Sequence, residues 1–189
     1  MKILNSDLIA IIIVLLVSVT GCKKDEKDVS PFVGNYVIYE AKLTEALTVP
    51  TNEFGNFPIA VGTVITQAIQ TALLSAVTCS SAGKSYVECR EDFSLYLSCE
   101  GANPLNAGTW EEVSATSLKL NLNNTAIPSS PTGIVLTVTD IIINATGLTG
   151  KTIVPLPKTM ISGMIAPLTL DPAAQEMFLA KFSIEFKKK

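Results

Sequence analysis

The middle of the chain carries carboxylates that could support acid–base chemistry: Glu88, Glu91, Asp92, Glu100, Glu111 and Glu112. Paired carboxylates hydrolyse glycosides when two of them face each other across a cleft. Most of these residues fall at predicted turns or strand ends, where a solvated surface charge is the usual role. The sequence therefore gives a carboxylate enzyme little support, and we expect a protein without catalytic activity.

Other kinds of active site lack the residues that they need. The 189-residue chain has no histidine, which is the usual general base, the partner of Ser and Cys nucleophiles and the commonest metal ligand. It has no Gly-x-Ser-x-Gly run to present a serine nucleophile. The net charge of -3, from 14 basic and 17 acidic residues, leaves no basic stripe for phosphates. We expect no metal, no cofactor and no nucleic-acid partner.

The N-terminus has the pattern of an export signal that ends at a cysteine. Lys2 precedes an uninterrupted apolar run at residues 8–17. A membrane span needs about 20 residues, whereas the central segment of a signal peptide has about 7 to 15. The letters V-T-G-C at residues 19–22 resemble the lipobox of bacterial lipoproteins. The resemblance implies that residues 1–21 are a signal peptide and that the Cys22 thiol receives a diacylglyceryl group. An ordinary signal or an uncleaved anchor is the alternative.

Residues 22–30 are predicted to be the lipid-bearing cysteine and a flexible tether. The run K-K-D-E-K-D-V-S after Cys22 is charged and cannot bury a core. It resembles the Lys- and acid-rich stretch of lipoproteins that some Gram-negative bacteria move to the cell surface, although a plain solvated spacer fits equally well. Two or three acyl chains hold a protein durably on a membrane. We therefore expect a domain that is lipid-anchored to the outer membrane and faces the periplasm or the cell surface.

Residues 31–189 are predicted to form a single β domain. In the clearest segment Phe178, Ala180, Phe182, Ile184 and Phe186 alternate with polar side chains, the period-2 pattern of a half-buried strand. The predicted strands are residues 33–41, 85–89, 93–99, 109–113, 117–122, 134–139, 141–145, 159–165 and 178–186. Exposed loops are expected at residues 123–133 and at residues 154–157, where two prolines disfavour ladder pairing.

One segment has helical rather than β periodicity. Between residues 62 and 77 the apolar positions Ile65, Ile69, Ala72, Leu73 and Ala76 recur at helical spacing, with threonine and glutamine on the opposite side. This pattern predicts an amphipathic helix with one apolar face. Its place between the first strand and the next hairpin suggests a lid or plug packed on a barrel mouth.

About eight short strands with turn signals between them predict an antiparallel barrel or sandwich. The letters V-G-N-Y at residues 33–36, G-T-W at 108–110 and S-L-K-L at 117–120 resemble the lipocalin-like domain of some bacterial lipoproteins, over residues 31–145. The resemblance implies an eight-stranded barrel that binds a small apolar ligand. The interior of such a barrel either holds one small ligand or is filled by side chains.

Two functions therefore remain open. The first is an envelope lipoprotein that binds a small hydrophobic ligand in its barrel. The second is an interaction module with a solid core, which binds a protein or a host component through rim loops. The sequence names no ligand-binding residue. Trp110, the only tryptophan, could cover a ligand, but core packing is the expected role for an aromatic residue in such a strand.

Three cysteines, Cys79, Cys89 and Cys99, remain after Cys22 has been assigned to the lipid. Export places them in an oxidising compartment, where a disulfide is expected. A metal site is the alternative, but it would lack a fourth ligand and any Cys-x-x-Cys spacing.

Hairpin geometry selects a pair among these cysteines. With a turn at residues 90–92, Cys89 faces Phe93, and Cys99 lies about 20 Å further along the strand, beyond the roughly 7 Å limit for a disulfide. Cys99 would instead face the neighbourhood of Gly83, close in the chain to Cys79. We therefore predict a disulfide between Cys79 and Cys99, with a bond between Cys79 and Cys89 if the turn is misplaced.

Overall fold

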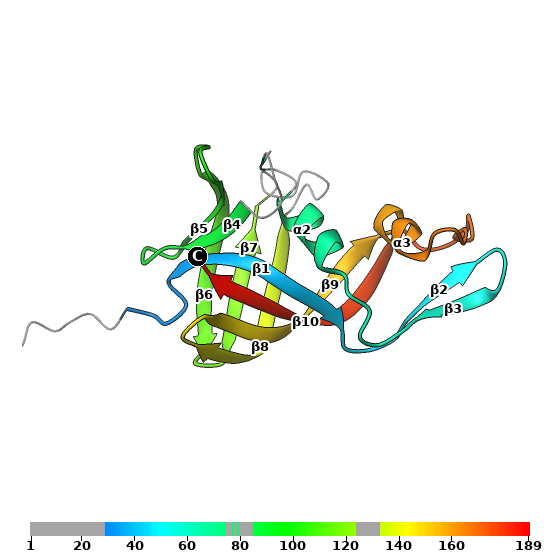
Figure 1. The fold of residues 1–189 in the computed structure, drawn as a ribbon, viewed down its shortest axis with the longest axis horizontal. Coiled ribbons are helices and arrows are strands. Elements are labelled where there is room, and N and C mark those ends of the chain that lie inside the picture. The colour runs from blue at the N-terminus through cyan, green and yellow to red at the C-terminus, as the bar shows by residue number, and fades with distance from the viewer. Residues whose placement is uncertain (1–28, 75–76, 78, 80–84, 124–132) are drawn as a thin grey trace, which may run out of the picture.

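The computed structural model describes residues 29–74, 77, 79, 85–123 and 133–189, which form a mainly β protein built on a closed antiparallel barrel (Figure 1). Around the barrel the strands follow the order β1-β10-β9-β8-β7-β6-β5-β4. Their bounds are Gly34–Leu43 (β1), Ser85–Cys89 (β4), Ser94–Cys99 (β5), Leu105–Ser114 (β6), Ser117–Leu122 (β7), Ile134–Asn144 (β8), Gly147–Pro157 (β9) and Met177–Lys188 (β10). The predicted fold class is confirmed. The predicted signal peptide, Cys22 and the tether up to residue 28 lie outside the described residues.

Alternation along the strands fills the barrel with apolar side chains. In β10 the five predicted inward positions, from Phe178 to Phe186, are all buried, while Lys181 lies on the exposed side. On β7, Leu118, Leu120 and Leu122 are buried in the same way. One continuous core therefore runs through the barrel, because each strand turns every second side chain towards the axis.

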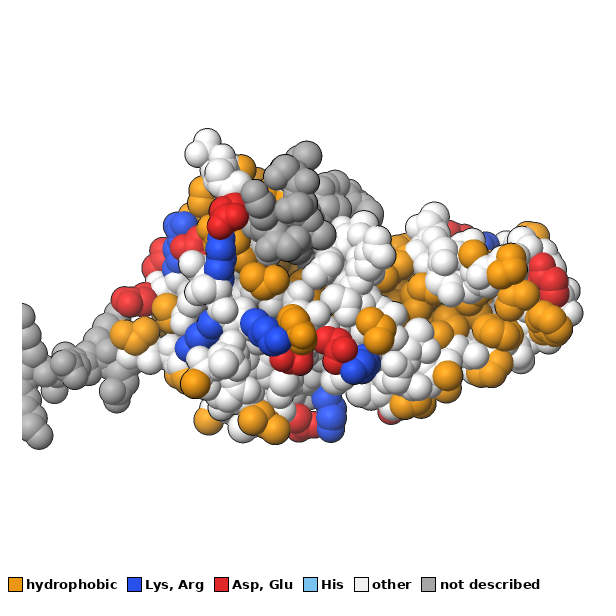
Figure 2. Space-filling model, viewed as in Figure 1, with side chains coloured by type: hydrophobic (Ala, Val, Ile, Leu, Met, Phe, Trp, Pro, Cys, Tyr) orange, Lys and Arg blue, Asp and Glu red, His pale blue; other side chains and the backbone are white. Residues whose placement is uncertain are grey.

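Two insertions leave the ring of strands. The hairpin of β2 (Leu47–Thr51) and β3 (Gly55–Ile59) follows β1, and helix α3 (Lys158–Ile165) lies between β9 and β10. The hairpin contacts the segment after α3, since Asn52 N–H donates to the Thr169 carbonyl at 3.0 Å. Figure 1 shows this hairpin and α3 at one end of the long axis, with the N-terminal segment leaving at the other end. Hydrophobic side chains gather on the surface at the hairpin end (Figure 2). The hairpin was not predicted from the sequence.

The barrel closes at a short seam between β1 and β4. These strands share three pairs, Gly34 with Cys89, Asn35 with Glu88 and Tyr36 with Val87. Beyond the seam, residues 62–66 lie along the free edge of β1. Among their bonds, Gly62 N–H donates to the Leu43 carbonyl at 2.8 Å.

Helix α2 spans Thr66–Leu74, so it begins later than the predicted residue 62. The residues before it use their backbone groups on β1, as when Ile65 N–H donates to the Ala41 carbonyl at 2.8 Å, and they are therefore not free to form a helical turn. Ile65 and Ile69 are buried as predicted. The side chains of Ala72, Leu73 and Ala76, which the prediction also used, lie outside the described residues.

The predictions for residues 134–165 need three corrections. The two strands expected at 134–139 and 141–145 are one strand, β8, with a register shift between Thr139 and Ile142 at the expected break. The loop expected at residues 154–157 belongs to β9, which pairs with β10 through Pro157. In the described residues β9 pairs with β8 only up to Lys151, so the prolines interrupt no ladder on that side.

The third correction is that the strand expected at residues 159–165 is helix α3. Ile161 and Ile165 are buried, and Met160 and Met164 pack against the core. These pairs are spaced four residues apart, which is a helical period. The segment is too short for that period to stand out from a strand pattern in the sequence.

The predicted disulfide between Cys79 and Cys99 is confirmed, with 5.7 Å between the Cα atoms, and Cys89 is free and buried. The pairing of β4 with β5 differs by two residues from the register assumed in the prediction. Cys89 pairs with Leu95 and Cys99 pairs with Ser85, because the turn includes Phe93.

Loss of this disulfide is expected to destabilise the fold by about 3 kcal/mol, because the bond closes a loop of about 20 residues in the unfolded chain. The measurement is guanidinium unfolding of Cys99→Ala with and without dithiothreitol. The reductant should lower the stability of the wild type and leave the variant unchanged. Equal stability of the wild type and Cys99→Ala under oxidising conditions would contradict the prediction.

Candidate functional site

The interior of the barrel, where the predicted ligand would bind, contains only a small void among the described residues. Its volume is about 20 Å³, and it is lined by Tyr36, Val87, Cys89, Leu118, Leu120, Val138, Leu148 and Phe186. A water molecule needs roughly 10–15 Å³ on this measure. The void therefore has room for about one water, and its lining offers that water no polar surface.

Side chains close the interior around this void. At the end where the N-terminal segment enters, Phe32 is fully buried, and the Tyr36 hydroxyl donates to the Pro31 carbonyl at 3.4 Å. Further along the barrel, a Cβ on Gly150 would lie 2.5 Å from Cγ1 of Val138, so even one methyl group would not fit there. The described part of the barrel is filled in the manner of a protein core.

Two titratable groups face the void and are held neutral. Burial raises the pKa of the Cys89 thiol from 9.0 to about 12, and the nearby charge of Glu88 adds to the shift. Burial likewise raises the pKa of Tyr36 from 10.0 to about 12, with a smaller effect of Cys89. Because a thiol reacts as its thiolate, Cys89 is expected to be inert in the folded protein.

These pKa shifts predict a loss of stability at alkaline pH. Both groups release their protons more readily in the unfolded chain, so their contribution is complete below about pH 9 and is lost as the pH rises towards 12. Guanidinium unfolding at pH 8 and pH 10.5 measures the effect. Cys89→Ala should lose less stability between the two pH values than the wild type does. An equal decline in both proteins would refute the role of the thiol.

A larger hollow lies outside the barrel, where the N-terminal segment meets it. We call it the tether-side groove. Its volume is about 620 Å³, and most of its surface is apolar. Its lining residues are Val29, Ser30, Pro31, Val33, Glu91, Phe93, Trp110, Glu111, Glu112 and Ser114. They come from residues 29–33, the β4–β5 turn and β6.

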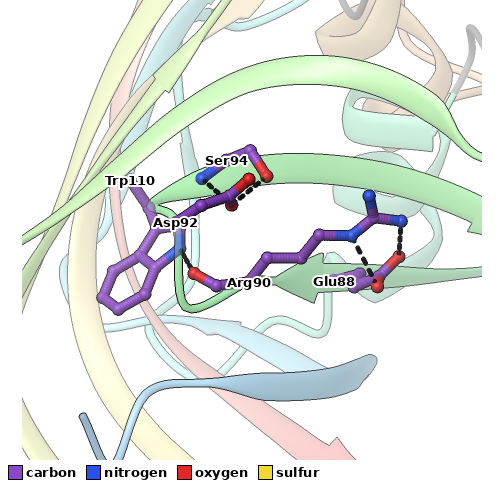
Figure 3. Close-up of polar contacts among 5 residues, drawn as sticks. All are labelled: Glu88, Arg90, Asp92, Ser94 and Trp110. Carbon is purple, nitrogen blue, oxygen red and sulfur yellow. Dashed lines mark hydrogen bonds and ion pairs between the residues drawn. The ribbon is translucent and has the colours of Figure 1, made fainter. Parts of the chain in front are cut away.

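The β4–β5 turn is fixed by hydrogen bonds (Figure 3). The Arg90 carbonyl accepts a hydrogen bond from Nε1 of Trp110 at 2.9 Å. Asp92 accepts hydrogen bonds from the backbone N–H and the hydroxyl of Ser94, and these bonds lower the pKa of its carboxyl group. Oε1 and Oε2 of Glu88 accept bonds from the Arg90 guanidinium at 2.8 and 3.0 Å. The turn is therefore a rigid wall of the groove.

Phe93 is the exposed aromatic residue of this wall. The predicted strand at residues 93–99 began with Phe93, but in the structure this residue has a φ of 63° in the turn and its side chain is 53% exposed. Its ring lies 5.1 Å from the ring of Trp110, which is 2% exposed. Trp110 is thus a core residue, as expected, and it also supports the aromatic surface of the groove.

The six carboxylates considered for acid–base chemistry fall into two sets in the structure. Glu91, Glu111 and Glu112 line the tether-side groove. Glu111 pairs with Lys119 at 3.6 Å, and Glu112 accepts a hydrogen bond from the Ser30 hydroxyl.

The second set lies outside the groove lining. Glu88 is paired with Arg90, and Asp92 accepts from Ser94. Glu100 pairs with Lys189 at 3.4 Å. The described residues contain no group of three metal-ligating side chains, and no helix among them is long and apolar enough to cross a membrane.

Comparison of the chain with protein-family models, with curated proteins and with solved structures gives no match in any of the three.

Proposed function

We propose that this protein is a lipid-anchored envelope protein whose barrel is a packed scaffold, and that it acts without catalysis by binding a partner at the tether-side groove. The observation that carries the proposal is the contrast between the two spaces. The void inside the barrel measures about 20 Å³, while the groove outside it measures about 620 Å³.

The character of the groove supports this proposal. Binding sites are commonly hollows of roughly 300–1,000 Å³ with apolar walls and a few polar groups. The groove has such walls in Val29, Pro31 and Phe93, and its polar groups are three carboxylates and two serine hydroxyls. Since the Ser30 hydroxyl bonds to Glu112, the segment that continues into the tether is itself part of the wall.

A ligand carrier is the second candidate function. It is favoured by the eight-stranded closed barrel and by the wholly apolar lining of the interior void. The carrier requires the barrel to widen when the ligand enters, because the void of about 20 Å³ is far smaller than any lipid.

Native mass spectrometry of the protein purified from its own membrane distinguishes the two functions. The packed scaffold predicts a mass equal to the polypeptide with its attached acyl chains and nothing more. A further lipid-sized mass that survives repeated preparations would favour the carrier and overturn the scaffold.

A further inference from the structure

The tether-side groove has an unbalanced charge. Glu91, Glu111 and Glu112 are exposed, and the described residues that line the groove include no lysine or arginine. The nearby cations are already engaged, Lys119 with Glu111 and Arg90 with Glu88. Glu111 already has Lys119 as its ion-pair partner, so an occupant that neutralises Glu91 and Glu112 must supply positive charge of its own.

The aromatic surface of the groove suits the same charge. The ring of Phe93 is half exposed and is supported by Trp110. A lysine or arginine side chain lies favourably on an aromatic face, at about 0.5–1 kcal/mol for an exposed site, while its methylene groups cover apolar surface. A basic side chain could thus pair with a groove carboxylate and pack on the ring of Phe93 at the same time.

The path of the chain limits where the partner can be. The groove lining begins at Val29, seven residues after Cys22. An extended chain spans at most about 3.6 Å per residue, so the groove would lie within about 25 Å of the lipid-bearing residue. Figure 1 shows the N-terminal segment leaving from this end of the barrel, with the β2–β3 hairpin at the other end.

The lipid-anchored function proposed above places this end near the membrane, and resting on it we propose that the tether-side groove binds a basic segment, with apolar residues between its lysines or arginines, of another envelope protein close to the membrane surface. Charge complementarity with the acidic groove, above all with Glu91 and Glu112, selects the segment, and contact with Phe93 and Pro31 adds affinity. A zwitterionic lipid headgroup also offers a cation, but it brings a phosphate towards the same carboxylates.

The test uses the full chain in uncharged dodecyl maltoside micelles and a dansyl-labelled peptide, Lys-Leu-Lys-Leu-Lys. Trp110 is the only tryptophan, so energy transfer from it to the dansyl group reports binding at the groove. We expect saturable transfer that weakens between 50 and 500 mM NaCl. The combined substitution Glu91→Gln, Glu111→Gln and Glu112→Gln should weaken binding about 10-fold, as the sum of three exposed charge interactions.

A matched variant changes the net charge equally at ion-paired carboxylates outside the groove lining. It combines Glu45→Gln, Glu176→Gln and Glu185→Gln, which pair with Lys181, Lys158 and Lys187. We expect this variant to bind the lysine peptide like the wild type. Circular dichroism of both variants verifies that they are folded.

Three results would overturn the proposal. The first is that the peptide Glu-Leu-Glu-Leu-Glu binds as tightly as the lysine peptide, which would show that the groove recognises only apolar groups. The second is equal weakening in both triple variants. The third is absence of lysine-peptide binding. These results are independent of the masses that test the packed scaffold, so either proposal can fail while the other stands.

Discussion

Cys22→Ala is expected to abolish incorporation of labelled palmitate and to end durable, acyl-dependent membrane attachment. The lipobox-like letters at residues 19–22 make the Cys22 thiol the predicted acceptor of the acyl chains. Each buried CH₂ contributes about 0.8 kcal/mol to membrane binding, so loss of two or three chains removes almost all of the attachment energy. The measurement is palmitate labelling followed by membrane fractionation and by the mass of the N-terminus.

Cys89→Ala is the matched control for this experiment. Cys89 is a buried free thiol of the same chain, so its removal should leave both labelling and fractionation unchanged. If the Cys22→Ala protein stays bound as firmly as the wild type, or if the wild type takes up no palmitate, the anchor has been assigned wrongly. A retained leader on the wild-type protein would point to the same conclusion.

Phe186→Ala is expected to destabilise the fold by about 3–5 kcal/mol, the usual cost of deleting a buried aromatic side chain. Phe186 lines the interior void, and its ring meets Tyr36 edge to face at a centroid distance of 6.4 Å. The substitution should enlarge a dry, apolar space into one that accepts a small hydrocarbon. Thermal unfolding with and without benzene measures both effects, because a bound ligand raises the unfolding temperature.

The matched control is Phe54→Ala, which removes the same ring from a side chain that is 68% exposed. It should change the stability by less than about 0.5 kcal/mol and gain no response to benzene. If benzene already raises the unfolding temperature of the wild type, the barrel is not a packed scaffold. If Phe186→Ala costs no more than Phe54→Ala, the side chain does not support the core.

Strand periodicity and cysteine spacing carried most of the fold prediction. β10 was predicted almost to its bounds because every second residue from Phe178 to Phe186 is buried on one barrel wall. The bond between Cys79 and Cys99 could be predicted because a hairpin fixes which residues face each other. An error of two residues at the turn did not change the chosen pair, since both registers bring Cys99 near the start of β4.

The failures occurred where tertiary contacts override local pattern. Residues 154–157 were predicted to be a loop because proline has no N–H to donate to a neighbouring strand. In the structure this part of β9 pairs only with β10, so hydrogen-bond donors are needed on one side of the strand only. Phe93 was predicted to begin the strand at residues 93–99, yet its backbone belongs to the turn and β5 begins at Ser94. The tether-side groove has parts from residues 29–33, 91–93 and 110–114, and no sequence pattern links segments so far apart.

The segment of residues 62–65 that lies along β1 affects how readily one molecule could pair with another. Molecules confined to a membrane meet one another far more often than molecules dispersed in solution, and a bare strand edge could then recruit the same strand of a neighbour into a growing fibre. Here the backbone of residues 62–65 already occupies the groups of Ala41 and Leu43 that such a strand would use. If the proposed anchor confines the protein to a membrane, this cover would block strand pairing between neighbouring molecules along this part of β1.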